Sequence, residues 1–178
     1  PIQLDENPSP LRLARELNDW VDRHGGSREY GELAKRAGAD ALAKWTRSRS
    51  RQADLFSASI DPASVWRAAG TGAGFCEVSR VFFANFVERY LKYFLEREAS
   101  AELASIGERE EFGRRLEEQI EFLSHHAFDT AQITQSFAAG WFNKRVAEDR
   151  RPNDQEIIGF LAFAFSKLRQ ELQREAAE

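Results

Sequence analysis

The segment FCEVSRVFFANFVERYLKYFLERE, residues 75–98, decides the fold because it is the most apolar long stretch of the chain. Its apolar residues lie on most of a helical circumference and leave only a narrow polar stripe, as in a helix surrounded by other helices. A membrane span is excluded, because charged side chains inside the stretch would be costly in hydrocarbon. Within residues 75–95, the part long enough to span a bilayer, these side chains are Glu77, Arg80, Glu88, Arg89 and Lys92. We therefore predict a central, buried helix and no membrane partner.

The composition is that of a folded globular protein. The chain has 178 residues, of which 42% are hydrophobic and 30% charged, and it contains 14 Phe and 4 Trp. A disordered chain would lack so many aromatic residues, and this length is typical of one compact body. A single cysteine, Cys76, allows no intrachain disulfide, and the start of the sequence carries no apolar signal segment. We therefore expect a cytoplasmic protein.

Helical periodicity continues on the N-terminal side of the central segment. Ser9 and Pro10 predict the cap and first position of a helix that ends at the glycine pair 25–26. A short second helix is expected to end at Gly38, and Asp40 to cap a third helix that continues through Trp45. This part of the chain therefore predicts a small helical subdomain.

The C-terminal side also has a helical pattern, with helices expected at residues 108–126, 130–148 and 155–176. No segment shows the sustained alternation of a strand between turn signals. The sequence predicts an all-α helical bundle of about six to seven helices around the central helix at about residues 75–98.

Turn-forming residues between the two parts predict a boundary. Asp61 and Pro62 are followed by glycines at 70, 72 and 74. We expect an N-terminal helical subdomain with a basic segment at residues 1–56, a linker at 57–74 and the main helical bundle at 75–178.

Positive charge is concentrated in the N-terminal part. The net charge is −4, yet eight Lys and Arg face only three Asp and Glu between Arg23 and Gln52. Within this segment the run KWTRSRSR, residues 44–51, alternates guanidinium groups, which bind phosphate, with hydroxyl groups, and Trp45 is suited to stacking on a base. The predicted nucleic-acid-binding residues are Lys35, Arg36, Lys44, Trp45, Arg47, Arg49 and Arg51. The alternative is a solvated linker with Trp45 in the core.

The segment LAKRAG, residues 33–38, followed by ADALAKW, residues 39–45, resembles the core of a phage-repressor-type helix-turn-helix. In that family a glycine makes the turn and the next helix enters the major groove. The resemblance covers some twenty residues and implies that Asp40, Lys44 and Arg47 face DNA. A helix–Gly–helix corner inside any bundle has the same pattern, so both interpretations are open.

Two further patterns are candidate ligand sites. The glycine-rich segment 70–74 precedes the central helix and has backbone N–H groups suited to an anion, but no strand or following lysine completes a phosphate loop. Glu117, Glu121 and His125 share a helical stripe, but one stripe is too few ligands for a metal. We predict no metal and no cofactor.

The aromatic residues outnumber what one face of each helix needs. We therefore expect a protein partner or a homo-oligomer that forms through the aromatic helices, with complete burial in the monomer as the alternative. The residues concerned are Phe82, Phe83, Phe86, Tyr90, Tyr93, Phe94, Trp141, Phe142, Phe160, Phe163 and Phe165.

No catalytic constellation is evident, so we expect a binding protein and no enzyme. The leading hypothesis is a helical module, a nucleic-acid-associated subunit or regulator of a larger bacterial-type assembly, that contacts DNA or RNA phosphates through residues 35–51. The alternatives are a protein–protein adaptor or scaffold with no nucleic-acid role and a helical-bundle metalloenzyme that uses Glu117, Glu121 or His125.

Overall fold

The computed structural model describes residues 9–24, 27–54, 62–148 and 152–175, and these residues confirm the all-α bundle. Over these ranges the chain forms six helices and no strand. None of the described helices has the length and hydrophobicity to cross a bilayer. The helices are α1 (Pro10–His24), α2 (Arg28–Asp54), α3 (Pro62–Ala69), α4 (Gly72–Glu102), α5 (Ile106–Ala147) and α6 (Asp154–Glu175).

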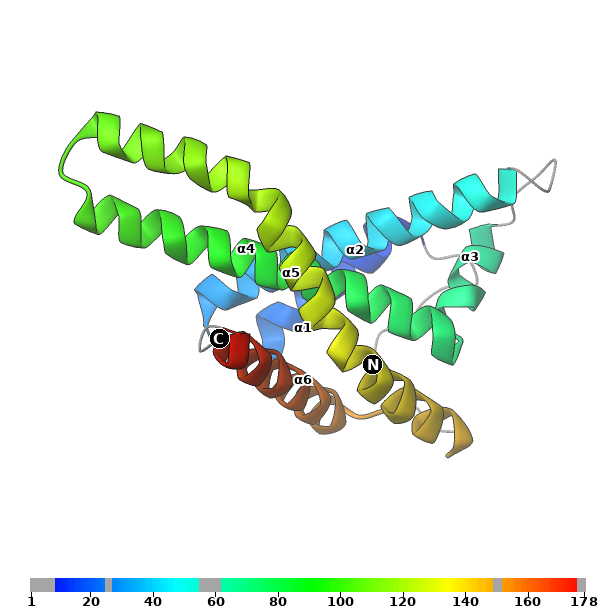
Figure 1. Ribbon diagram of the computed structural model, residues 1–178. Helices are drawn as coiled ribbons and strands as arrows, with labels where there is room; N and C mark the ends of the chain where they lie inside the picture. Colours follow the sequence, from blue (N-terminus) through cyan, green and yellow to red (C-terminus); the bar gives the residue numbers. More distant parts are fainter. Residues whose placement is uncertain (1–8, 25–26, 55–61, 149–151, 176–178) are drawn as a thin grey trace.

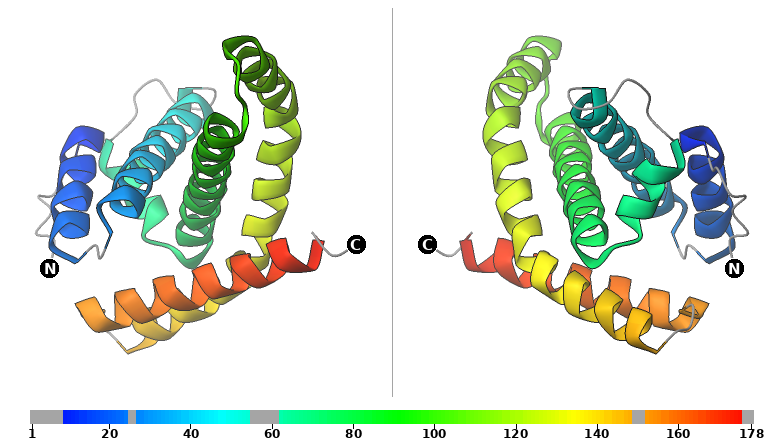
Figure 2. Two further views of the ribbon diagram at one scale, coloured as in Figure 1. Left: turned by 90° about the vertical axis from the view of Figure 1, so that its left-hand side faces the viewer. Right: turned by 90° about the vertical axis from the view of Figure 1, so that its right-hand side faces the viewer.

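The helices are arranged around α4. Helices α1, α2, α4 and α5 stand side by side in that order, and α6 lies across their base (Figure 2). The far ends of α4 and α5 form an antiparallel hairpin that projects from the body, and α3 lies near the start of α4 (Figure 1). The central helix predicted at residues 75–98 is confirmed, and it is longer than expected at both ends.

The main core is built from one side of α4, α5 and α6. Phe83 of α4 is 1% exposed and lies in one buried cluster with Ala138 of α5 and Ala164 of α6. The Phe165 ring of α6 meets Phe83 edge-on, with 5.3 Å between ring centroids. Alanines on α5 and α6 thus make room for aromatic rings from α4, which interlock as close-packed interiors require.

The other side of α4 packs against α2, which presents small residues. Ala37, Gly38 and Ala41 are buried on one face of α2. A Cβ added at Gly38 would overlap the Leu17 side chain, so this glycine lets α1 approach α2 closely. Small residues on α2 therefore allow the neighbouring helices to pack close to its backbone.

The expected break at Gly38 is wrong, because α2 runs without interruption from Arg28 to Asp54. Gly38 keeps a helical conformation and serves packing, and the flanking alanines favour helix continuation. The turn implied by the helix-turn-helix resemblance is therefore missing. The basic run at residues 44–51, for which a solvated linker was the alternative, lies in the second half of α2.

The expected pair of helices at residues 108–126 and 130–148 is also wrong, because α5 is one continuous helix. Residues 127–129 contain neither glycine nor proline, so no strong signal stops the helix there. The segment 57–74, expected as a linker, contains α3, while residues 55–61 lie outside the described residues. The boundary itself stays a prediction.

Side-chain caps define several helix starts. The Ser9 hydroxyl accepts a hydrogen bond from Arg12 N, with Pro10 at the first helical position as predicted. Ser105 and Glu108 cap each other reciprocally at the start of α5, and Asn153 and Glu156 do the same at α6. These are capping boxes, in which two unpaired backbone N–H groups are satisfied at once.

A polar contact joins α1 to the start of α6. The Trp20 indole donates to one Asp154 oxygen at 3.2 Å, and His24 Nε2 lies 3.2 Å from the other. The Trp20 and His24 rings stack with centroids 4.6 Å apart. The Trp20 hydrogen bond, together with His24, lowers the pKa of Asp154.

The first prediction concerns acid stability. A lowered pKa in the folded state means that the ionised Asp154 contributes stability above the ordinary aspartate pKa of about 3.9, and this stability is lost as the pH falls through that range. Asp154→Asn should lower the thermal midpoint at pH 7, and the gap to wild type should shrink towards pH 3. A gap of constant size between pH 7 and pH 3 would contradict the assignment.

The second prediction compares two glycines in helices. A Cβ at Gly74 would overlap the backbone of Ala68, whereas one at Gly113 meets nothing within 4 Å. Gly74→Ala should lower the free energy of unfolding by about 1–3 kcal/mol through overpacking, and Gly113→Ala should raise it by about 0.5–1 kcal/mol. Urea denaturation measures both values. A neutral Gly74→Ala would show that α3 does not approach α4 as described.

Candidate nucleic-acid interface

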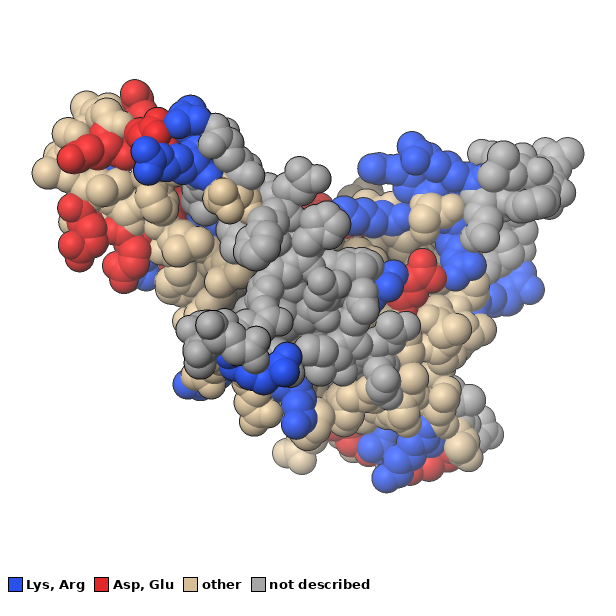
Figure 3. All heavy atoms as spheres, in the orientation of Figure 1, with Lys and Arg blue, Asp and Glu red and all other residues tan. Residues whose placement is uncertain are grey.

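The predicted basic residues lie on α2, and several of them are engaged inside the protein. Lys and Arg side chains gather over the C-terminal half of α2 in the space-filling view, at the right-hand end of the molecule (Figure 3). Asp and Glu are most frequent on the projecting α4–α5 hairpin at the opposite end. Acidic residues thus predominate on the hairpin, which also carries arginines, and basic residues predominate over the C-terminal half of α2.

Lys35 belongs to the contact between α1 and α2. Its amine forms ion pairs with Asp22 of α1 and, at 2.9 Å, with Glu32 on its own helix. Hydrogen bonds to Asp22 and Glu32 raise the pKa of Lys35. The Lys35 amine is therefore protonated, and two carboxylates offset its charge, which leaves it poorly placed to bind a phosphate.

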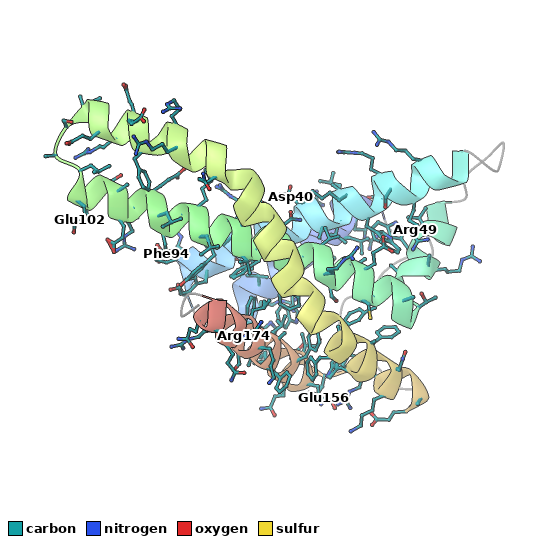
Figure 4. The ribbon with its side chains drawn as sticks, in the orientation of Figure 1. Asp40, Arg49, Phe94, Glu102, Glu156 and Arg174 are labelled. Carbon is teal, nitrogen blue, oxygen red and sulfur yellow. The ribbon has the colours of Figure 1, made fainter. Side chains whose placement is uncertain are left out.

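Lys44 and Arg49 connect α2 to α4. The Lys44 amine donates to Asn85 Oδ1 at 2.8 Å, and an Arg49 nitrogen lies 3.0 Å from a Glu77 oxygen. Asp40, labelled with Arg49 in Figure 4, forms an ion pair with Arg89. Polar side chains therefore cross the α2–α4 interface at several levels and hold the two helices in register.

Trp45 is part of the core. It is 2% exposed, and its indole donates to the carbonyl oxygen of Val65 at 3.3 Å. The guanidinium of Arg49 lies over the ring, 4.4 Å from its centroid. Stacking of Trp45 on a base is therefore wrong for this structure, because no ring face is open. The sequence did contain a signal for this burial, because Ala37, Ala41 and Trp45 lie at helical spacing on one face.

Arg36, Arg47 and Arg51 form the remaining exposed set, which we call the arginine stripe. All three are exposed, and within the described part of the chain no ion pair involves them. At 3.6 residues per turn they fall within about 60° of the helix circumference, with Arg47 and Arg51 about 6 Å apart along the axis and Arg36 about 16 Å before Arg47. The stripe therefore places three arginines on one side of a continuous helix.

The residues implied by the helix-turn-helix resemblance are not arranged to meet DNA together. Asp40 and Lys44 point towards α4, where Arg89 and Asn85 hold them, and Arg47 alone is exposed without such a contact. The polar stripe of α4 could have predicted these contacts, because polar residues inside a buried helix need partners on the helix that covers them.

The glycine-rich segment before α4 has a structural explanation. Thr71 caps α4, and its hydroxyl accepts from Gly74 N at 3.1 Å. A Cβ at Gly72 would overlap Asn143 of α5, as one at Gly74 would overlap α3. These glycines allow close helix packing, and the Gly74 N–H that an anion would need is already bonded.

The side chains of Glu117, Glu121 and His125 lie outside the described residues, so the metal hypothesis has no described geometry. Among the side chains that are described, no three His, Cys, Asp or Glu form a group suited to a metal ion. Cys76 is buried, and its burial raises the pKa of the thiol. An inert core thiol is what such a setting produces.

Comparison with protein-family models, with curated proteins and with solved structures gave no match to this chain.

The third prediction separates the core residue from the surface residue beside it. Trp45→Ala should lower the free energy of unfolding by about 3–5 kcal/mol, because it removes a buried indole. Arg47→Ala, two residues away and exposed, should change it by no more than about 0.5 kcal/mol. Urea denaturation followed by far-UV circular dichroism measures both. Equal, small effects of the two substitutions would place Trp45 on the surface instead.

Proposed function

We propose that this chain is a non-enzymatic helical binding module that contacts nucleic-acid phosphates through the arginine stripe of Arg36, Arg47 and Arg51. The observation that carries the proposal is their exposure without a described acidic partner, while Lys35 and Arg49 are paired with carboxylates. Guanidinium groups that are not neutralised internally remain available for bidentate contacts with phosphate.

The distribution of charge supports local binding by an overall acidic chain. The net charge is −4, but Asp and Glu are most frequent on the hairpin, away from the C-terminal half of α2, where Lys and Arg gather (Figure 3). At physiological ionic strength the Debye length is about 8 Å, so distant carboxylates are screened at the stripe. Binding should then be governed by the few nearby guanidinium groups and should weaken steeply with salt.

The proposed polymer is duplex nucleic acid. Binding of single strands relies on exposed aromatic rings on which bases stack. Trp45, the aromatic residue of the basic segment, is buried and bonded to Val65. A row of arginines on a helix contacts a regular backbone without reading bases, so the contacts would position the protein without selecting a sequence.

The module is further proposed to work as a cytoplasmic subunit or regulator in a larger bacterial-type assembly, with a protein partner or a second copy bound through the aromatic helices. Large apolar side chains that stay exposed in the monomer support this part, among them Ile106, Ile158 and Phe163. A protein adaptor whose arginine stripe meets an acidic protein is the second candidate. Affinity for nucleic acid separates the two.

The fourth prediction is a salt dependence. Arg36, Arg47 and Arg51, changed together to Ala, should remove three phosphate contacts and reduce the slope of log K against log salt by about 2 to 3 on duplex DNA. Fluorescence anisotropy with duplex DNA, duplex RNA and single strands at several salt concentrations measures the slope and the polymer preference.

A charge-matched control keeps the interpretation specific. Arg109, Arg114 and Arg115 are exposed on the part of α5 that belongs to the hairpin, away from the C-terminal half of α2. Changing these three to Ala removes the same net charge and should leave the salt slope of wild type. Equal losses in both triple variants would mean that total charge acts and the stripe does not. No binding of wild type at low salt would move the proposal to the adaptor.

A further inference from the structure

Lys44 forms a hydrogen bond inside the protein and still keeps its charge. The residue is exposed on α2, and its amine donates to Asn85 Oδ1 of α4 at 2.8 Å. The Asn85 amide is neutral, and no ion pair of Lys44 exists within the described residues. An ammonium group has three donor hydrogens, so two remain after this bond. The contact therefore orients the amine without offsetting its charge.

Lys35, on the same helix, has partners of the opposite kind. Its amine pairs with Asp22 of α1 and with Glu32, and these two carboxylates offset its charge. A hydrogen bond inside the protein thus does not by itself remove a lysine from phosphate binding; the charge of its partner decides. An amide partner for Lys44 and carboxylate partners for Lys35 therefore distinguish two lysines that are alike in sequence.

The carboxylate best placed along α2 to pair with Lys44 bonds elsewhere. Asp40 (Figure 4) precedes Lys44 by four residues, the spacing at which a carboxylate and a lysine pair on a helix. In the structure Asp40 forms an ion pair with Arg89 of α4. Helix α4 thus brings two different groups to this part of α2. The guanidinium of Arg89 offsets the charge of Asp40, and the Asn85 amide leaves that of Lys44.

Lys44 lies at the edge of the arginine stripe. On an ideal helix, Lys44 and Arg51 fall within about 20° of each other around the circumference and about 10 Å apart along the axis. Arg47 lies between them along the axis, within about 60° of either, and Arg36 lies about 12 Å before Lys44. The four cations span about 22 Å of α2, a length over which a duplex strand presents a phosphate about every 3.4 Å.

Asn85 has a costly setting for a polar side chain. It is 6% exposed on α4, and its amide nitrogen has no hydrogen-bond partner in the described structure. A buried amide donor without a partner is destabilising. The half of the amide that does form a bond is its oxygen, which accepts from Lys44. Packing alone therefore does not explain an amide at this position, whereas orientation of Lys44 does.

We propose that Lys44 is a fourth phosphate-binding cation beside the arginine stripe and that Asn85 is its positioning residue. An amine that is already oriented loses less conformational entropy when it binds a phosphate. Because Asn85 is neutral, it provides this orientation and leaves the whole positive charge for the ligand. The inference rests on the proposed function, since it adds one contact and its support to the same nucleic-acid surface.

The first test removes the cation. Lys44→Ala should reduce the slope of log K against log salt on duplex DNA by about 1, because one phosphate contact is lost. The matched control is Lys144→Ala, since Lys144 is exposed on the last turn of α5 and has no ion pair within the described residues. It removes the same charge and should keep the wild-type slope in fluorescence anisotropy. Equal slopes for wild type and Lys44→Ala would overturn the proposal.

The second test changes the charge of the partner and nearly keeps its shape. Asn85→Asp places a carboxylate against the Lys44 amine, as in the pairs of Lys35, and should also reduce the slope by about 1. Far-UV circular dichroism checks that the variant folds. Gln173→Glu adds the same charge at an exposed position of α6 and should leave the slope unchanged.

A third variant separates positioning from a purely structural role. Asn85→Ala removes the acceptor and leaves the Lys44 charge, so it should weaken binding at each salt concentration and keep the wild-type slope. A structural role would make the Asp and Ala variants change the slope alike, and that result would overturn the role of Asn85. If Asn85→Asp does not fold, a slope reduced by Asn85→Ala would overturn it equally.

The outcomes distinguish this inference from the proposed function. If the triple arginine variant loses slope and Lys44→Ala does not, the stripe stands and the inference fails. If Lys44→Ala loses slope and the triple variant does not, Lys44 binds phosphate and the stripe fails. No binding of wild type to duplex DNA at low salt would overturn both.

Discussion

Burial of α4 on both sides is the constraint on which the rest of the structure depends. An apolar helix of this length is stable in water only if other helices cover it. On one side, alanines of α5 and α6 accept its aromatic rings around Phe83. On the other, α2 offers the small residues Ala37, Gly38 and Ala41. Helix α4 therefore lies between α2 on one side and α5 and α6 on the other.

The same constraint divides the cations of α2 into two groups. Those facing α4 or α1 bond to polar partners: Lys44 donates to Asn85, and Arg49 pairs with Glu77. Those on the outer face, such as Arg47, have no such contact in the described structure. Packing therefore determines which members of the basic segment remain exposed without a described partner.

The fold class and the central helix were predictable, because long apolar periodicity and the cap at Ser9 are local signals. The continuity of α2 and α5 was not. Gly38 resembles a turn in sequence, and its role in the close approach of Leu17 depends on a helix elsewhere in the chain. The partners of the basic segment also lie on a distant helix, so the sequence showed the segment but not that Glu77 and Asn85 would bond to two of its cations. The burial of Trp45 was one of two alternatives.

The central claim is that a nucleic-acid backbone lies along the outer face of α2. Hydrogen–deuterium exchange of the full chain, with and without saturating duplex DNA, tests it most directly. The account predicts slower exchange at residues 44–54 in the complex, with the hairpin around Ile106 unchanged. Saturated binding with protection confined to the hairpin or to α6, and none in α2, would contradict it.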